Sequence, residues 1–583
     1  MQNSSSLCSG QYDIFPGFPV QTGDISIGYT ALARQIAAQV AVGCRQFVID
    51  GYGGVFWEVF REALAQALAT LGLRAVWTEA QTALKPAADV DRLIAPFLGG
   101  NDPLFGTRFT GTLADFFEAG PLGALRPDPT AAVNILYGPG AALAGWSGWL
   151  IYLDVPKVEI QNRSRAGQIT NLGASRPADP KGMYKRFYFV DWVAFNAHKA
   201  DLLPKIDLFI DAQTAGEPVM TSGAVLREAI TRMSHNYFRV RPWFEPGPWG
   251  GQWMKTHIPQ LPQEKVNYAW SFELIVPENG LMLADGDRRL EFSFDLLMAQ
   301  AYPEVLGRGA ARFGSEFPIR FDFLDTFDGG NLSVQCHPRP EYVRERFGES
   351  FTQDETYYIL DCKPGARVYL GFREDIDPRA FRAELERSFA QAAPVEIEKY
   401  VHTEPAHKHD LFLIPNGTIH CAGANNMVLE ISSTPYIFTF KMYDWLRQDL
   451  DGRPRPLNIQ RAFDNLYFDR KGARIHQEFV SHPRLIERGD TWELYHLPTH
   501  PDHFYDVTRV RFTGRVTLPT NRSCQVMSLV EGQAVILETR EGMRQCFNYP
   551  ETFVVPAAAE QFTLINDTDE PVMVVMAFLK DRH

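Results

Sequence analysis

Residues 331–338 read Asn-Leu-Ser-Val-Gln-Cys-His-Pro, a run with the apolar and polar alternation of a β-strand. Side chains two positions apart on a strand point to the same face, so Gln335 and His337 are predicted to lie side by side. An amide oxygen and an imidazole are both able to bind a divalent ion. This segment therefore predicts one half of a metal site carried by a strand.

Two later segments supply the other half of the predicted site. Glu355 lies in Asp-Glu-Thr-Tyr-Tyr-Ile-Leu (354–360), a second strand pattern. Residues 411–420 read Leu-Phe-Leu-Ile-Pro-Asn-Gly-Thr-Ile-His, an apolar strand followed by a Pro-x-Gly turn that delivers His420. Two imidazoles, a carboxylate and an amide oxygen suit a divalent ion and leave a position open for water or substrate. We therefore predict that one metal ion binds to these two residues and the two of the first segment.

The order of these motifs resembles that of the class I mannose-6-phosphate isomerases, whose metal lies in the mouth of a small β-barrel called a cupin. The resemblance rests on Ser-Val-Gln-Cys-His-Pro (333–338), Pro-Asn-Gly-Thr-Ile-His (415–420) and Tyr-Asp (443–444), and it extends over roughly residues 243–470. It implies a zinc-dependent aldose-ketose isomerase, although manganese or iron would suit the same ligands. Carried over position by position, the zinc ligands of that family fall on Gln335, His337, Glu355 and His420.

The same resemblance implies roles for residues outside the ligand set. An isomerase of this kind moves a proton between C1 and C2 of an open-chain sugar through an enediolate, so it needs a cation at the oxygens and a base over the carbons. Lys441 is the candidate catalytic residue. The residues expected to contact the substrate are Trp249, in a Trp-Gly-Gly motif, Ser333 and Arg320.

The chain departs from the family pattern at three basic positions. Gln353 stands where the family has lysine, Lys441 where it has arginine, and Asp322 where it has a further lysine, the last in a less secure alignment. These changes lower the positive charge that a phosphate would meet. We therefore expect a hexose or hexose derivative that is unphosphorylated, or that bears its charge elsewhere.

Two other functions and one other metal cluster fit parts of the sequence. Loss of the basic residues favours a sugar- or metabolite-sensing protein without activity, and an epimerase or lyase would use the same enediolate. His402, His407 and His409 form a competing group of imidazoles. A cupin would place a carboxylate four or five residues later, where Leu413 and Ile414 stand, so we interpret this loop as solvated.

The first 235 residues show helices alternating with strands, which predicts an α/β domain with a parallel sheet. The pattern resembles a P-loop nucleoside or uridine kinase. In such kinases Gly-x-x-x-x-Gly-Lys-Ser/Thr holds the phosphates. Here the slot reads Gly-Tyr-Gly-Gly-Val-Phe-Trp (51–57), and no Gly-Lys pair occurs in the chain. We expect a degenerate domain kept for packing, assembly or regulation.

At ordinary domain size, 583 residues suit three or four domains. The motifs and the resemblance imply three: the α/β domain at 1–235, the metal-binding cupin with a helical part at 236–475, and a second, structural cupin-like barrel at 476–583. A net charge of −13 argues against nucleic acid or an anionic membrane as the main partner. A sugar is the expected small-molecule partner, and a homo-oligomer is compatible with the sequence. Seven scattered cysteines and the lack of a signal peptide indicate the cytoplasm. The uncharged run 130–153 is expected to form two buried strands.

Overall fold

The computed structural model describes residues 8, 10–100, 102–449, 452 and 455–581. They divide into two compact units. An α/β unit contains Pro16–Met233 and Pro277–Tyr302, and a β-rich unit contains Met1–Phe15, Ser234–Val276 and Pro303–His583. Residues 277–302 thus belong with the N-terminal α/β unit although they follow it by more than forty positions. The three-domain division stays a prediction, and residues 1–7, 9, 582 and 583 of its outer domains lie outside the described residues.

The α/β unit is built on a sheet with the strand order β2-β8-β7-β6-β3-β5-β4. Its strands are β2 (Ser26–Ile27), β3 (Gln46–Gly51), β4 (Ala75–Glu79), β5 (Val133–Tyr137), β6 (Trp149–Asp154), β7 (Leu208–Asp211) and β8 (Val219–Ser222). Strands β7, β6, β3, β5 and β4, neighbours in that order, are parallel, as predicted. The uncharged run 130–153 forms the buried strands β5 and β6, which confirms that prediction. Among the described residues, no helix is long and apolar enough to cross a membrane.

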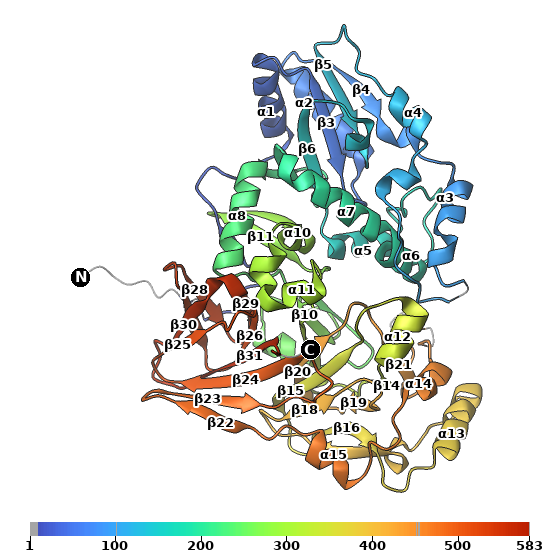
Figure 1. Cartoon of the computed structure of the whole chain (residues 1–583), viewed down its shortest axis with the longest axis vertical. Helices are drawn as coiled ribbons and strands as arrows, with labels where there is room; N and C mark the ends of the chain where they lie inside the picture. Colours follow the sequence, from blue (N-terminus) through green and yellow to red (C-terminus); the bar gives the residue numbers. More distant parts are fainter. Residues whose placement is uncertain (1–7, 9, 101, 450–451, 453–454, 582–583) are drawn as a thin grey trace. The chain divides into compact units, whose positions relative to one another are not determined.

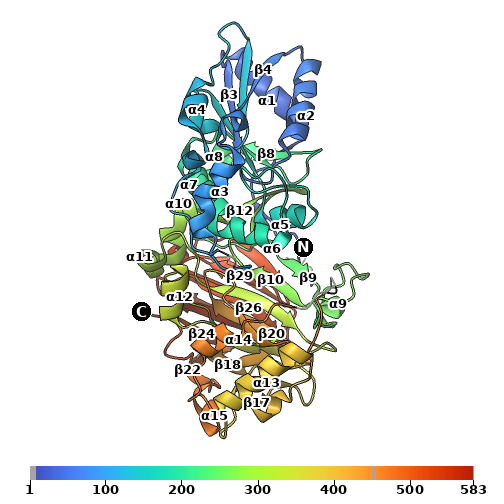
Figure 2. The same cartoon turned by 90° about the vertical axis from the view of Figure 1, so that its right-hand side faces the viewer.

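Helices cover both faces of this sheet, as a parallel sheet with apolar strands requires. Figure 2 shows α1 and α2 along one face and α4 on the other. The helices are α1 (Tyr29–Ala41), α2 (Trp57–Thr70), α3 (Ala87–Ile94), α4 (Ala119–Ala124), α5 (Lys157–Arg165), α6 (Pro180–Arg186), α7 (Trp192–Leu202) and α8 (Gly223–His235).

The glycine loop at the end of β3 (residues 51–54) packs against side chains of the α/β unit. In the strand order of the sheet, the chain leaves β3 toward β4 on one side and leaves β6 toward β7 on the other. The loop after β3 lies at this reversal point, where ligands usually bind in parallel sheets. A Cβ at Gly53 would lie 3.2 Å from the Phe195 ring, and one at Gly54 would lie 3.1 Å from Ile160. Side chains of this unit therefore fill the space beside the loop.

Buried ion pairs tie the later segment of the α/β unit to its sheet. Asp295 accepts from Lys157 and, at 2.6 Å, from Lys199, and Lys199 also lies 3.2 Å from Asp154 at the end of β6. Asp295 lies in the first turn of α10 (Phe294–Leu306), which follows the small sheet of β1 (Phe18–Pro19), β11 (Gly280–Asp285) and β12 (Arg288–Ser293). Both lysine side chains are almost fully buried, so the carboxylates are needed to neutralise them.

In the β-rich unit, two antiparallel sheets form a barrel, with the orders β18-β15-β20-β13-β10-β9 and β17-β16-β19-β14-β21 (Figure 1). The first contains β9 (Trp243–Glu245), β10 (Trp270–Leu274), β13 (Arg320–Asp325), β15 (Asp354–Cys362), β18 (Leu411–Ile414) and β20 (Asn426–Ser433). The second contains β14 (Val334–Cys336), β16 (Arg367–Phe372), β17 (Val401–Pro405), β19 (His420–Ala422) and β21 (Phe440–Tyr443). The accompanying helices are α9 (Trp253–His257), α11 (Ala310–Phe313), α12 (Pro340–Phe347), α13 (Pro378–Gln391), α14 (Ile459–Asn465) and α15 (Ala473–Glu478).

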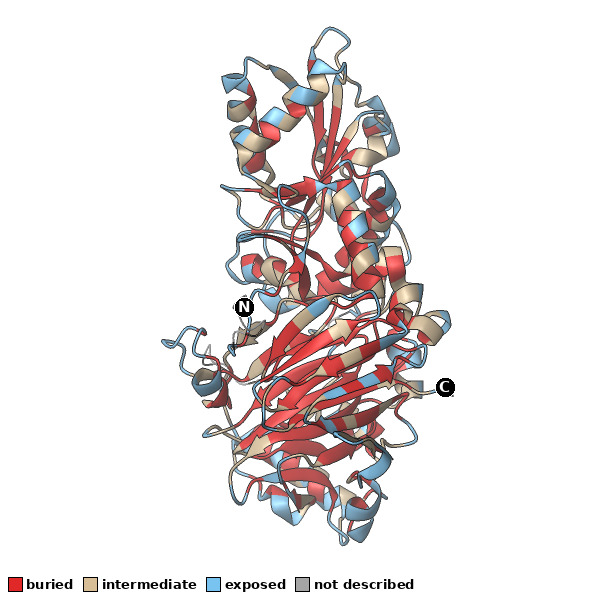
Figure 3. Ribbon diagram, turned by 90° about the vertical axis from the view of Figure 1, so that its left-hand side faces the viewer, coloured by how far each residue is buried: buried red, intermediate tan, exposed pale blue. Residues whose placement is uncertain are grey.

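A second pair of antiparallel sheets follows, with the orders β22-β23-β24-β31-β26-β29 and β25-β30-β27-β28. The first contains β22 (Arg484–Arg488), β23 (Trp492–Leu497), β24 (Tyr505–Phe512), β26 (Gln525–Glu531), β29 (Thr552–Val555) and β31 (Val572–Leu579). The second contains β25 (Arg515–Pro519), β27 (Ala534–Thr539), β28 (Arg544–Asn548) and β30 (Gln561–Ile565). Apolar side chains fill their interior, and Figure 3 shows most strands of the unit as buried.

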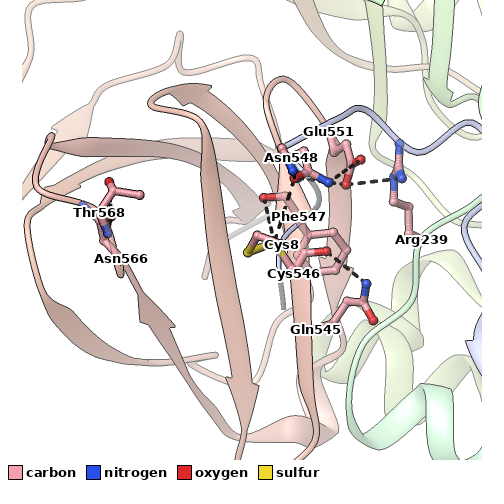
Figure 4. The surroundings of a disulfide bond; sticks show 10 residues. Cys8, Arg239, Gln545, Cys546, Phe547, Asn548, Glu551, Asn566 and Thr568 are labelled. Carbon is pink, nitrogen blue, oxygen red and sulfur yellow. Dashed lines mark hydrogen bonds and ion pairs between the residues drawn. A yellow bond between two sulfur atoms is a disulfide. The ribbon is translucent and has the colours of Figure 1, made fainter. Parts of the chain in front are cut away.

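The N-terminal segment is fastened to this second pair of sheets. A disulfide joins Cys8 to Cys546 of β28, which the spacing of the cysteines did not predict. Figure 4 shows it beside Asn548 and Glu551. Asn548 accepts from the Gly10 backbone N–H, and Glu551 lies 3.3 Å from Arg239. The first described residues are thus held by covalent and polar contacts.

Candidate metal centre

Strand β14 brings three of the predicted site residues together. It pairs with β19 through Gln335 and His420 and with β21 through Gln335 and Lys441. Residues directly opposite each other in an antiparallel ladder project from the same face. Gln335, His420 and Lys441 therefore point to the same side of the sheet, and His337, two residues after Gln335, joins them.

The turn that delivers His420 depends on a glycine. Gly417 has φ +72°, and a Cβ there would lie 2.5 Å from the Tyr467 ring and 2.6 Å from the Asn465 carbonyl oxygen. The Gly417 N–H donates to the His337 carbonyl, which links the turn to the other histidine. Buried Arg470 donates to the carbonyls of Pro415 and Asn416 and fixes the turn further.

Glu355 of β15 meets both histidines from the facing sheet. Its Oε1 lies 2.8 Å from His337 Nε2, and its Oε2 lies 3.2 Å from His420 Nε2. Gln335 Nε2, as the amide is oriented here, lies 3.4 Å from His420 Nε2. The two histidines and the glutamate are essentially inaccessible to solvent. The four predicted ligands thus converge between the two sheets.

Backbone carbonyls orient both imidazoles. His337 Nδ1 lies 2.9 Å from the Phe438 carbonyl oxygen, and His420 Nδ1 lies 2.9 Å from that of Thr418. A ring nitrogen facing a carbonyl must carry the proton, so Nε2 of each neutral ring keeps its lone pair and turns it toward Glu355.

Two polar atoms of this centre would be satisfied by a bound cation. His337 Nε2 and Glu355 Oε2 are buried without a hydrogen-bond partner among the described residues. Lone pairs that face one another inside a protein are unfavourable unless a proton or a cation lies between them. The donor set of two Nε2 atoms, a carboxylate and an amide therefore fits a divalent ion.

Two more carboxylates lie on the inner face of the first sheet. Asp322 pairs directly with Glu430, and Glu430 pairs with Tyr357, next to the row that carries Glu355. Burial, followed by the charges of the neighbouring carboxylates, raises the pKa of Asp322 and of Glu430 well above their ordinary values. Sequence analysis missed Glu430, although a charge in the apolar run Val-Leu-Glu-Ile (428–431) was a visible signal.

The predicted catalytic and substrate residues occupy different places around this centre. Lys441 is half-buried and lies opposite Gln335 in the ladder. Arg320 shares the inner face with Glu355, two strands away, and donates to the Pro435 carbonyl. Ser333 donates to Asp444, at 2.9 Å, and accepts from Arg455, so its hydroxyl is engaged by the protein.

Trp249 is buried and makes an edge-to-face contact with Trp270, with 4.8 Å between the ring centroids. Its motif requires both glycines, because a Cβ at Gly250 would lie 2.3 Å from Asn267 and one at Gly251 would lie 2.0 Å from Asp325. Trp249 therefore contacts Trp270, which lies on the inner face of the sheet, and supports that ring. Its role in binding substrate stays a prediction.

The competing group of histidines does not converge. His402 contacts Glu404, His407 contacts Asp410, and His409 contacts Glu531. Among the described residues, the clustered side chains with metal-ligand geometry are His337, Glu355 and His420.

Fold and site together define a class of protein, a double-sheet β-barrel with a buried two-histidine, one-carboxylate centre. "Probable mannose-6-phosphate isomerase GmuF" of Bacillus subtilis (strain 168) is 23% identical to this chain over 333 residues, covering 57% of the chain and 96% of the relative. "Mannose-6-phosphate isomerase ManA" of the same organism is 23% identical over 293 residues, covering 50% and 85%. The chain is therefore a distant relative of mannose-6-phosphate isomerases over about half its length.

Residues 28–235 match a family described as "Domain of unknown function (DUF8485)". Among solved structures, mannose 6-phosphate isomerase from Bacillus subtilis aligns with a TM-score of 0.48 and 18% identity, covering 59% of this chain and 99% of that one. A "putative mannosephosphate isomerase from Archaeoglobus fulgidus" aligns with a TM-score of 0.45 and 19% identity, covering 59% and 98%. The resemblance of the N-terminal region to P-loop kinases stays a prediction.

Proposed function

We propose that this protein is a metal-dependent aldose-ketose isomerase that acts on a neutral hexose or hexose derivative through an enediolate. The observation that carries the proposal is the convergence of two oriented histidines, a glutamate and a glutamine inside the barrel, where two of their polar atoms find no hydrogen-bond partner in the described part of the chain. Sequence similarity to mannose-6-phosphate isomerases supports the reaction class.

Zinc is the proposed ion, held by Gln335, His337, Glu355 and His420. When bound, it would polarise the sugar carbonyl and stabilise the negative charge of the enediolate. The backbone carbonyls of Phe438 and Thr418 orient the two histidines so that their Nε2 atoms face Glu355. Manganese or iron would suit the same donors.

Groups of the chain itself are placed to handle protons and hydroxyls. Lys441, opposite the ligand Gln335, is the proposed group that moves a proton or holds a substrate oxygen. Asp322 and Glu430 lie on the inner face beside Glu355 and are positioned to hydrogen-bond to sugar hydroxyls. Gln353 and Asp322 stand where a phosphate ester would need basic side chains, which supports a neutral substrate.

Two alternatives use the same centre. A sensing protein would bind the sugar without turnover, and the replacement of basic residues by Gln353 and Asp322 favours it. An epimerase would form the same enediolate and return the proton to the other face. Retention of a buried, polar ligand set favours an enzyme, because such a cluster is costly without a cation.

Incubation of the metal-loaded protein with free and phosphorylated hexoses in heavy water separates these functions. Ketose that carries deuterium at C1 or C2 supports the isomerase. Deuterium exchange without ketose would indicate an epimerase, and binding without exchange would indicate a sensor. Glu355→Gln, which removes the ligand charge, is the matched inactive variant.

A further inference from the structure

Three aromatic rings extend the inner face of the first sheet beyond the metal centre. Phe272 stacks on Trp243 with 4.3 Å between ring centroids, and Trp270 lies parallel to Phe272 at 6.2 Å. All three are partly exposed. Trp243 ends the stack, and its indole N–H donates to Glu245 at 3.3 Å, which fixes the orientation of the ring.

Strand register places these rings on the same face as Glu355. Trp243 pairs with Phe272, and Phe272 pairs with Asp322. The same row continues from Asp322 to Glu430 and Tyr357. Opposite residues in an antiparallel sheet share a face, so the rings, the two carboxylates and the metal ligand line one surface.

Exposure changes along this row. Asp322 is 6% exposed and Glu430 is 8% exposed, whereas Phe272 and Trp243 are of intermediate exposure. The row therefore runs from a closed polar interior near the metal ligand to a more open aromatic end at β10 and β9. An elongated ligand fits such a gradient better than a compact one.

The spacing of the strands sets the length of that ligand. Glu355 on β15 is separated from Phe272 on β10 by two intervening strands, β20 and β13. Strands lie about 4.8 Å apart, so the two positions are roughly 14 Å apart. Six carbons joined by bonds of about 1.5 Å span roughly 6 Å when extended, which is less than half of this distance. A single hexose held at Glu355 crosses about one strand spacing, to β20, and does not reach Trp243 on β9.

The chemistry along the row selects a neutral sugar with a second ring. Carboxyl groups of Asp322 and Glu430 would accept or donate hydrogen bonds to hydroxyls or a glycosidic oxygen, and they offer no positive charge to an anion. An indole face offers an apolar surface that matches the C–H face of a pyranose. Both features are found in order along one row of the sheet.

We propose that Trp243, supported by Phe272 and Trp270, binds the second ring of a neutral oligosaccharide whose reducing end lies at the metal centre. This inference rests on the proposed function for the position of the reducing end. It names the substrate class of that function as a sugar extended by a glycosidic bond, and it assigns a binding subsite to the β9–β10 edge of the sheet.

Calorimetric titration of the zinc-loaded protein with mannose, mannose 6-phosphate and a 1,4-linked disaccharide of mannose tests the subsite. The disaccharide should bind more tightly than either monosaccharide. Trp243→Ala should weaken disaccharide binding about tenfold, the scale of one stacking contact, and leave mannose binding unchanged. Trp243→Phe, which keeps an aromatic face, should restore most of the affinity.

Phe244→Ala is the matched control, because Phe244 neighbours Trp243 on the same strand, is also partly exposed, and points to the opposite face, where it contacts Tyr12 and Tyr268. It should leave disaccharide binding unchanged. The inference is overturned if Trp243→Ala affects mannose and the disaccharide by the same factor, if it affects neither, or if Phe244→Ala has the same effect. Ketose formation is assayed separately from binding, so failure of the isomerase proposal alone would appear as Trp243-dependent binding of the disaccharide with no ketose formed.

Discussion

Single residues determine whether the barrel holds an ion. His337 and His420 each offer an Nε2 lone pair turned toward Glu355 by a backbone carbonyl at the other ring nitrogen. Replacing either one by alanine removes one of two imidazoles from the set. We expect metal content to fall from one ion per chain to a small fraction in each single variant and to zero in the double variant.

Elemental analysis of the purified variants after dialysis measures this. His407→Ala is the control, since that side chain is 73% exposed and contacts Asp410 outside the centre. Full occupancy in the double variant would show that the ion is bound elsewhere.

Lys441 and the carboxyl groups of the inner face are expected to affect which substrate is turned over. We expect mannose 6-phosphate to be a poorer substrate than the neutral sugar, because Gln353 and Asp322 stand where the family pattern has lysine and leave less positive charge for the phosphate. Lys441→Met should lower kcat for the neutral sugar about a hundredfold, the usual scale of a lost acid–base group. High turnover of the phosphate ester by the wild type, lost in Lys441→Met, would contradict this and restore the ordinary function of the relatives.

A buried carboxyl group in the α/β unit should make stability depend on pH. Burial, followed by the charge of Glu291, raises the pKa of Asp211 to about 7. A raised carboxyl pKa means that the folded state binds the proton more tightly than the unfolded state. The stabilisation is therefore present below about pH 4 and is lost as pH rises from there to about 7.

Asp211→Asn removes this dependence. Its stability relative to the wild type should rise between about pH 4 and 7, by at most about 4 kcal/mol, and stay constant above. Loss of the bonds that Asp211 accepts from Gln213 and Glu291 adds a constant offset. Thermal unfolding of both proteins from pH 5 to 8 measures the difference, and parallel curves would refute the assignment.

The convergence of the four proposed metal ligands was predictable because each lies in a short local motif whose spacing reflects a strand or a turn. Glu430 and Trp243 were not, because their surroundings arise from pairing between β9, β10, β13 and β20, which are far apart in sequence. The local sequence pattern shows which residues of a strand share a face. It does not show which strand lies beside it.

At the level of elements, α10 depends on one carboxylate. Despite burial, the charges of Lys157 and Lys199 lower the pKa of Asp295, so it is ionised and neutralises both lysines. Asp295→Asn leaves two buried ammonium groups with less negative charge than they need. We expect it to destabilise the α/β unit by about 3 to 5 kcal/mol.

Calorimetric melting of the full chain tests this expectation. Asp287→Asn, an exposed aspartate in the turn between β11 and β12, is the matched control and should change stability little. Equal melting temperatures for Asp295→Asn and the control would show that the ion pairs are not needed.

Strands and helices of the α/β unit followed from apolar periodicity, whereas the grouping of residues 277–302 with that unit did not. It depends on long-range contacts such as the ion pairs of Asp295, and no local pattern carries such information. The pairing of Cys8 with Cys546 was unpredictable for the same reason, since their sequence separation is 538.

For the molecule as a whole, we expect no phosphotransfer activity. The glycine loop after β3 is packed against Phe195 and Ile160, and the neighbouring lysines already pair with carboxylates. No P-loop lysine follows the loop in the sequence. Titration of the full chain with ATP and magnesium should give no heat of binding and no phosphate release. Micromolar, magnesium-dependent binding would contradict this expectation.

The short strand β14 lies between β19 and β21 and carries the proposed ligand Gln335 in the middle of its three residues. Side chains on a strand alternate, so inserting or deleting one residue within 334–337 would exchange the ligand face for the apolar face. At least one of Gln335 and His337 would turn away from Glu355. The exposed turn at Gly286 and Asp287 has no such constraint. In related sequences, insertions and deletions should therefore accumulate in surface turns and be absent from β14. Point substitutions in β14 could still be tolerated.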